Sequence, residues 1–356
     1  MKKKIAAVAS AIALTTFAVG CGPNNPGGAN GTTGGNNGNA TGNASTTGNG
    51  IKVGLVTDTG GLNDNGFNHL AYVGVTKAQQ QLGIRPSVVQ SQSESDYIPN
   101  LSKYAGQGYN LVIAVGYLMH DAVEQVAQQY PKTHFMIIDD TITDRPNVVS
   151  AVYNSQDAGY LAGAMAGLLE KGTALPNLNK QNVVGVIGGQ SAPPVNSYIA
   201  GFQQGFKKED PSGKVLLAYT NSFTDQSLGS QYAQNQMSQG ADILFPVAGG
   251  CGQGVISAVK SANKYAIGVD TNQSYLAPQN IITSATKGVD TSVFDVIQTV
   301  KDNTFKSGVQ TFGLQGNGVG ITPAMKGVPQ SVVTEVNQLK QSIINGTIKV
   351  STTVQK

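Results

Sequence analysis

From Ile51 onward, short runs of apolar residues alternate with longer segments in which apolar residues recur at helical spacing. The short runs predict strands at residues 51–57, 111–115, 134–138, 183–187, 214–219, 243–247, 265–269 and 281–285. The longer segments predict helices at residues 65–81, 119–129, 157–169, 196–208, 227–239, 254–262, 291–301 and 331–344. Such alternation is typical of parallel sheets covered by helices.

The series of strands begins twice, once at Ile51 and again near Asn182, each time with a valine-rich strand. The 306 residues from Ile51 to the end of the chain also exceed the usual size of a single hydrophobic core. We therefore expect an α/β protein with two similar doubly wound lobes.

The first residues have the pattern of a secretory signal peptide: lysines at positions 2 to 4, an apolar run at residues 5–19, and then Gly20 and Cys21. The apolar run is too short to span a bilayer core of roughly 30 Å. The small residues before Cys21 resemble the bacterial lipobox, in which the cysteine is lipidated, although Ala18 stands where that motif usually has leucine. Cleavage by an ordinary signal peptidase is the alternative. We expect a signal peptide at residues 1–20 and a protein held by lipid on Cys21 at the extracytoplasmic side of the cell membrane.

Residues 22–50 are almost wholly Gly, Asn, Thr, Ala and Pro, with no charged and no aromatic residue. Such a segment cannot bury a core, so residues 21–50 are expected to form a lipidated cysteine and a flexible linker. A coil of this length has a root-mean-square reach of roughly 30 Å, which lets the folded part stand clear of the lipid.

Composition excludes several classes of function. The chain has 23 basic and 20 acidic residues, and removal of the three signal-peptide lysines leaves 20 of each. A neutral chain lacks the basic surface of nucleic-acid-binding proteins. With Cys21 acylated, Cys251 is the only remaining cysteine, so neither an intramolecular disulfide nor a thiolate metal cluster is expected. The three histidines lie in no metal-ligand spacing, and we expect no metal and no cofactor.

Carboxylates and glycines follow five of the predicted strands: Asp58, Gly116, Asp139, Gly249 and Asp270. In open parallel sheets, ligands bind beyond the carboxyl ends of the strands. Ionised carboxylates only accept hydrogen bonds, so the expected ligand offers hydroxyl or amino donors rather than a phosphate. Any one of these residues could be an ordinary turn or cap residue, but together they predict a polar ligand-binding cleft.

The segment Val53-Gly-Leu-Val-Thr-Asp-Thr-Gly-Gly-Leu-Asn-Asp-Asn-Gly-Phe-Asn68 resembles the opening signature of the basic membrane protein (PnrA-like) family. These are lipid-anchored nucleoside-binding proteins of ABC transporters. Further matches follow in order over nearly the whole chain after the linker, at residues 135–139, 146–148, 159–163, 199–205, 222–225, 240–242, 248–250, 267–270, 283–287 and 316–320.

The resemblance implies a periplasmic-binding-protein type I fold, in which two Rossmann-like lobes are joined by a hinge of several chain crossings. We expect lobe 1 at residues 51–152 plus 273–305 and lobe 2 at residues 153–272 plus 306–356. It also implies a monomer that captures nucleosides, purines preferred, and delivers them to an ABC transporter permease.

The resemblance further implies a nucleobase stacked between Phe67 and Phe223, one from each lobe. Stacking on an aromatic ring is worth about 1–3 kcal/mol per base. Phe67 begins a predicted helix and Phe223 is expected at the end of a strand. Without the resemblance, both residues would be read as ordinary core.

At the base edge, the resemblance implies Asp58 and Asp139 as hydrogen-bond acceptors. Asn63 or Asn68 would supplement them, since an asparagine side chain can donate as well as accept. Near the ribose, Asp270 would accept from hydroxyls and Lys287 would donate to oxygens. Gly249 would bring backbone close to the sugar. A buried polar group left unpaired costs roughly 1–3 kcal/mol, so such a site favours nucleosides over free bases.

Three other functions fit parts of the pattern. Aspartates act as acid and base in calcium-dependent nucleoside hydrolases, but here they are scattered over separate strand ends, and we expect no enzyme activity. A lipid-anchored sensor or regulator on the same fold, and a binding protein for another polar solute such as a sugar, remain open.

Overall fold

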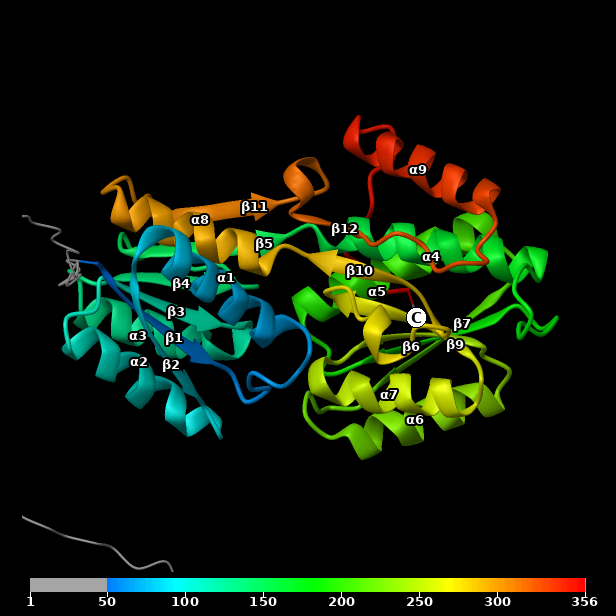
Figure 1. Ribbon diagram of the computed structural model, residues 1–356, viewed down its shortest axis with the longest axis horizontal. Helices are drawn as coiled ribbons and strands as arrows, with labels where there is room; N and C mark the ends of the chain where they lie inside the picture. The colour runs from blue at the N-terminus through cyan, green and yellow to red at the C-terminus, as the bar shows by residue number, and fades with distance from the viewer. Residues whose placement is uncertain (1–49, 356) are drawn as a thin grey trace, which may run out of the picture. The chain divides into compact units, whose positions relative to one another are not determined.

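The computed structural model describes residues 50–355, which form two α/β lobes, each built on a six-stranded sheet (Figure 1). This arrangement confirms the predicted α/β fold of two lobes. The expected signal peptide, Cys21 and the expected linker lie outside the described residues, apart from Gly50. Among residues 50–355, no helix has both the length and the apolar character needed to cross a membrane.

The sheet of lobe 1 has the strand order β11-β5-β4-β3-β1-β2, and all its neighbouring strands are parallel. The central strands β1, β3 and β4 are almost entirely buried, because helices cover both faces of the sheet. The strands are β1 (Lys52–Thr57), β2 (Arg85–Gln90), β3 (Leu111–Val115), β4 (His134–Ile138), β5 (Val148–Tyr153) and β11 (Gly308–Phe312).

The sheet of lobe 2 has the order β12-β10-β9-β8-β6-β7 and is parallel except for the antiparallel pair of β10 and β12. Its strands are β6 (Val183–Gly188), β7 (Lys214–Tyr219), β8 (Ile243–Val247), β9 (Tyr265–Asp270), β10 (Ile281–Lys287) and β12 (Val319–Ile321). The two sheets share the same order for their first four strands, which explains why the strand pattern begins twice along the sequence.

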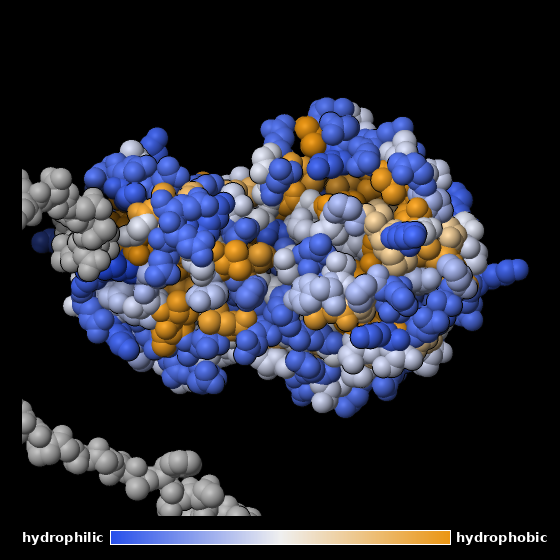
Figure 2. Space-filling model, viewed as in Figure 1, coloured by the Kyte–Doolittle hydropathy of each residue, from blue (hydrophilic) through white to orange (hydrophobic). Residues whose placement is uncertain are grey.

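Pairs of helices cover the faces of each sheet. In lobe 1, α1 packs with α8 and α2 packs with α3; in lobe 2, α4 packs with α5 and α6 packs with α7, while α9 lies on α4 (Figure 1). The helices are α1 (Phe67–Leu82), α2 (Tyr97–Gly106), α3 (His120–Gln129), α4 (Ser155–Gly172), α5 (Pro193–Glu209), α6 (Gln226–Ser238), α7 (Gly249–Ser261), α8 (Val289–Lys301) and α9 (Gln330–Ile344). On the face drawn in Figure 2, hydrophilic residues predominate and hydrophobic ones form separate patches.

Within residues 50–355 the chain passes between the sheets three times: after β5, after β10 and after β11. The predicted division of the chain needs two corrections. Strand β10 was placed in lobe 1 but pairs with β9 in the sheet of lobe 2, and β11 was placed in lobe 2 but pairs with β5 in lobe 1. An apolar run predicts a strand but not its pairing partner, so the assignment to a lobe failed where the chain crosses.

All the predicted strands and helices are present, with ends shifted by a few residues. The elements that were not predicted are β2, β5, β11, β12 and α2. Strands β2, β11 and β12 lie at or near sheet edges, and β2 and β11 are half exposed, so their sequences lack a continuous apolar run. Strand β5 follows β4 without an intervening helix, which breaks the alternation on which the prediction relied.

Glycines bring α4 and α5 of lobe 2 into close contact. A β-carbon on Gly163 would lie 2.1 Å from the carbonyl oxygen of Phe202, and one on Gly159 would lie 2.2 Å from that of Tyr198. Both distances are far below van der Waals contact, so only glycine allows the two backbones to approach this closely. The contact fixes the position of α5, whose first turns reach the space between the lobes.

Candidate functional site

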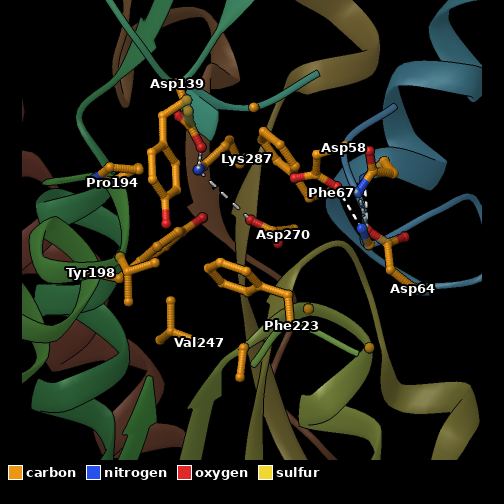
Figure 3. A pocket seen from close by; sticks show the side chains of 18 residues that line it. Asp58, Asp64, Phe67, Asp139, Pro194, Tyr198, Phe223, Val247, Asp270 and Lys287 are labelled. Carbon is orange, nitrogen blue, oxygen red and sulfur yellow. Dashed lines mark hydrogen bonds and ion pairs between the residues drawn. The ribbon is translucent and has the colours of Figure 1, made fainter. Parts of the chain in front are cut away.

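A cavity lies between the lobes at the carboxyl ends of their strands, where open parallel sheets bind ligands (Figure 3). The space within it amounts to about 580 Å³, part of which is open solvent. Its lining comprises Asp58, Gly60, Asp64, Phe67, Asn68, Gly116, Tyr117, Asp139, Pro194, Val195, Tyr198, Phe223, Val247, Ala248, Gly249, Gly250, Asp270 and Lys287.

The structure brings eight of the nine predicted ligand-binding residues together in this lining: Asp58, Phe67, Asn68, Asp139, Phe223, Gly249, Asp270 and Lys287. Asn63 is the exception. It is exposed and absent from the lining, and its main-chain oxygen accepts a hydrogen bond from Gln253 Nε2 at 2.9 Å. Phe223 also differs from its predicted place, because it lies in the loop between β7 and α6 rather than at the end of a strand.

One end of the cavity is formed by Asp58 and Asn68 of lobe 1. Asp58 Oδ1 accepts from Asn68 Nδ2 and from the Gly60 main-chain nitrogen, both at 2.8 Å. Burial raises the pKa of Asp58 to about 6, although these hydrogen bonds oppose the shift. The other amide atom, Asn68 Oδ1, is buried and has no partner among residues 50–355. The end of the cavity therefore presents carboxylate and amide oxygens to a ligand.

Asp64 fixes this arrangement by capping α1. Its carboxylate accepts from the main-chain nitrogens of Gly66, Asn68 and His69 at 3.0, 2.7 and 3.1 Å. These are N–H groups that the first turn of a helix otherwise leaves unpaired. The cap holds Phe67, the first residue of α1, with its side chain at the cavity.

Two glycines leave room for the functional side chains. Gly116 has φ of 116°, and a β-carbon there would lie 2.8 Å from Asp58 Oδ2. A β-carbon on Gly189 would lie 2.3 Å from the ring of Phe223, so that ring packs directly on the backbone after β6. Figure 3 shows Phe67 and Phe223 approaching the cavity from different sides, with Asp58 at one end and Tyr198 at the other.

Lys287, the last residue of β10, is buried at 4% exposure and is the only cation in the lining. Its ammonium group pairs with Asp139 of lobe 1 and lies 3.9 Å from Asp270 of lobe 2. Three aromatic rings surround the ammonium: the distances to the ring centroids of Phe67, Tyr153 and Tyr198 are 5.2, 5.4 and 5.1 Å. A buried charge requires such pairing.

Asp139 and Asp270 both adopt left-handed backbone conformations, with φ of 65° and 63°. Aspartate tolerates this region better than most residues, and unusual backbone conformations cluster at functional sites. Burial raises the pKa of Asp270 to about 6, while Lys287 opposes the shift and Asp139 adds to it. The lining thus holds four aspartates against one lysine, which suits a neutral ligand rich in donors.

Several lining residues were not predicted as ligand contacts. The first turns of α5 contribute Pro194, Val195 and Tyr198, whose spacing in the sequence is that of residues packing in a helix. Tyr117 directly follows Gly116, and its hydroxyl donates to Gln190 Oε1 of the other lobe at 2.9 Å. Asp64 could have been found, because an aspartate shortly before a predicted helix is the usual signal of an N-terminal cap.

Two other reactive groups lie outside the cavity. Among residues 50–355, one group of side chains has its oxygen and nitrogen atoms close enough together to hold a metal ion: His120, Asp121 and Glu124 on α3. None of them lines the cavity. Cys251 is fully buried, with Sγ 3.6 Å from Thr220 Oγ1, and packs within lobe 2 rather than contacting a ligand.

Comparison with known proteins agrees with this geometry. The chain is 34% identical over 320 residues to a CD4+ T-cell-stimulating antigen of Listeria monocytogenes, a match that covers 84% of this chain and 87% of the relative. It is 31% identical over 374 residues to the ABC transporter nucleoside-binding protein BmpA of Lactococcus lactis, covering 98% of this chain and 99% of the relative.

A solved structure of an ABC transporter solute-binding protein from Aeropyrum pernix K1 superposes with a TM-score of 0.79 at 26% identity, covering 86% of this chain and 94% of that one. This likeness confirms the type I periplasmic-binding-protein fold. The family model described as ABC transporter substrate-binding protein PnrA-like matches residues 51–353. The chain belongs to this family of substrate-binding proteins, which are the ligand-capturing components of ABC transporters.

Proposed function

We propose that this protein binds nucleosides, with purines preferred, in the cavity between its lobes and delivers them to the permease of an ABC transporter. The observation that carries the proposal is the pair of phenylalanines in one cavity, Phe67 from lobe 1 and Phe223 from lobe 2. A flat nucleobase between two rings gains about 1–3 kcal/mol per stacking contact. A sugar without a base has no aromatic face that could stack on the rings of Phe67 and Phe223.

We assign the polar atoms of the lining to a base end and a sugar end of the cavity. Asp58 and the unpaired Asn68 Oδ1 supply acceptors for N–H groups on the edge of a base. Asp270 supplies an acceptor for ribose hydroxyls, and Lys287 a donor for ribose oxygens. Asp139 pairs with Lys287, so we assign it to the sugar end rather than to the base edge.

Transport rather than catalysis fits the same residues. The carboxylates that line the cavity are engaged as a helix cap, as partners of Lys287 or as the partner of Asn68. Among the residues of this lining, no nucleophile is paired with a base. We propose a monomer that is not an enzyme. Lipid on Cys21 would hold it at the outer face of the cell membrane, with the linker giving it reach toward the permease.

A thermal-shift screen of nucleosides, free bases, pentoses and hexoses tests the proposal. A ligand at a hundred times its dissociation constant stabilises the folded protein by about 2.7 kcal/mol, which raises the melting temperature by several degrees. Purine nucleosides are expected to give the largest shift and free bases a smaller one. A shift with sugars alone would refute the assignment, and release of free base from inosine during incubation would refute the claim that the protein is not an enzyme.

A further inference from the structure

The hydroxyl group of Tyr198 is buried without a partner. Tyr198 lies on α5, lines the cavity and is 1% exposed. Its hydroxyl makes no hydrogen bond that meets the usual distance and angle with any residue among 50–355. Leaving such a group unpaired costs stability, so buried hydroxyls in proteins are almost always satisfied. The structure thus leaves the hydrogen-bonding capacity of this hydroxyl unused, in a side chain that lines the cavity.

The position of the Tyr198 ring is fixed by packing. The Lys287 ammonium lies 5.1 Å from its centroid, and Phe245 meets it edge-to-face at 6.0 Å and 80°. The backbone of Tyr198 is held by the glycine contact with Gly159 on α4. The hydroxyl is thus presented at a fixed point, as a specific hydrogen bond requires.

The surroundings of the hydroxyl determine which role it takes. Burial and the negative charges of Asp270 and Asp139 hold the pKa of Tyr198 well above its usual value, so the hydroxyl keeps its proton and can donate. Figure 3 shows the ring of Tyr198 reaching from α5 toward Asp270 and Lys287. Ser155 Oγ and the Asp270 carboxylate both lie close enough to this hydroxyl to change its pKa, although neither makes a hydrogen bond of the usual geometry with it. Ser155 Oγ is buried without a partner as well. A ligand hydroxyl at this point can donate to Asp270 and accept from Tyr198.

We propose that Tyr198 is a specificity-determining residue, whose hydroxyl donates to a ribose hydroxyl that in turn donates to Asp270. The inference rests on the proposed nucleoside function and adds to it that the site selects ligands that carry this hydroxyl. A site built to hydrogen-bond a substrate hydroxyl rejects the analogue that lacks it, because the protein groups then remain unpaired.

Isothermal titration calorimetry with inosine and with 2′-deoxyinosine, 3′-deoxyinosine and 5′-deoxyinosine tests the inference on wild type and Tyr198→Phe. The wild type is expected to bind one of the deoxy forms much more weakly than inosine. Tyr198→Phe is expected to bind inosine roughly 2–12-fold more weakly, the equivalent of one hydrogen bond, and to bind that deoxy form as the wild type does. Tyr219→Phe is the matched control, because its hydroxyl bonds to Asn196 in the same lobe and away from the cavity.

The outcomes separate this inference from the function on which it rests. If the wild type binds none of the four ligands, the nucleoside assignment fails, and the inference fails with it. If the wild type binds inosine but Tyr198→Phe keeps the same preference between inosine and every deoxy form, only the role of Tyr198 is overturned. An equal loss for all four ligands also overturns it, because it shows that the hydroxyl supports packing instead of selection.

Discussion

Hydrogen bonds between the lobes, away from the ligand-binding residues, are expected to set the affinity by stabilising the closed form. Gln253 Nε2 donates to Asn63 O at 2.9 Å, and the Tyr275 hydroxyl donates to Asn65 Oδ1 at 3.0 Å. In each pair the first residue belongs to lobe 2 and the second to lobe 1. We call these two bonds the latch. Opening the lobes must break both.

The size of the effect follows from the number of bonds. A typical hydrogen bond contributes about 0.5–1.5 kcal/mol net, so Gln253→Ala is expected to raise the dissociation constant roughly 2–12-fold. Tyr275 is 60% exposed, so its hydrogen bond competes with water. The increase in the dissociation constant for Tyr275→Phe is therefore expected at the lower end of this range. Because both bonds stabilise the same closed form, the double variant is expected to lose about the sum of the two single losses.

Stopped-flow binding and calorimetry measure this effect with the nucleoside that gives the largest thermal shift. The loss is expected in the dissociation rate, because the latch forms after the ligand has entered. Gln239→Ala is the control, since the side chain of Gln239, just after α6, bonds to Asn235 within that helix and not to the other lobe. Wild-type dissociation rates in both latch variants, with folding unchanged, would refute the reasoning.

Three further predictions concern the cavity and the core of lobe 2. Phe67→Ala and Phe223→Ala are each expected to weaken nucleoside binding at least 5–150-fold, the equivalent of 1–3 kcal/mol of stacking, while the circular dichroism melting curve of the free protein stays that of a folded chain. Affinity is expected to be nearly constant above about pH 7 and to fall below it in calorimetry from pH 5 to 8, because Asp58 and Asp270 have pKa values of about 6 and a donor ligand binds their ionised forms. Tighter binding on acidification would contradict this. Burial and the neighbouring Asp242 carboxylate hold the pKa of Glu170 far above its usual value, and neither of its carboxylate oxygens has a partner among the described residues. The folded protein therefore holds a proton that the unfolded chain releases, so the free energy of unfolding falls as pH rises above the ordinary pKa of glutamate. Glu170→Gln is expected to lose this pH dependence, so its melting temperature relative to that of the wild type rises between pH 5 and 8. A difference in melting temperature that does not change with pH would count against a protonated Glu170.

The fold could be predicted from the sequence wherever a strand is buried on both faces. Strands such as β1 and β3 are continuous apolar runs because helices cover both sides of them. Edge strand β2 contains Arg85 and Pro86 and is half exposed, so its pattern carries no comparable signal. Strand β10 belongs to lobe 2 because it pairs with β9, and the local sequence pattern gives no information about this pairing.

The site could be predicted where a residue follows a strand directly, as Asp58 and Asp139 do. Parallel strands place their carboxyl ends at one edge, so such residues meet by topology alone. Tyr198 could not be found in this way. It lies in a helix whose apolar spacing is that of ordinary packing, and only the folded structure shows that it lines the cavity.

Lys287 explains how one site can serve both the open and the closed form. It is the last residue of β10, and the chain crosses from lobe 2 to lobe 1 immediately after it. Its partners are Asp139 in lobe 1 and Asp270 in lobe 2, so the ion pairs at the proposed sugar end lie next to the crossing. The latch, in contrast, joins loops and helices away from the crossings and exists only when the lobes meet. Ligand contacts that span both lobes and the latch therefore favour the same closed form, and mutation of the latch changes affinity without removing any group that contacts the ligand.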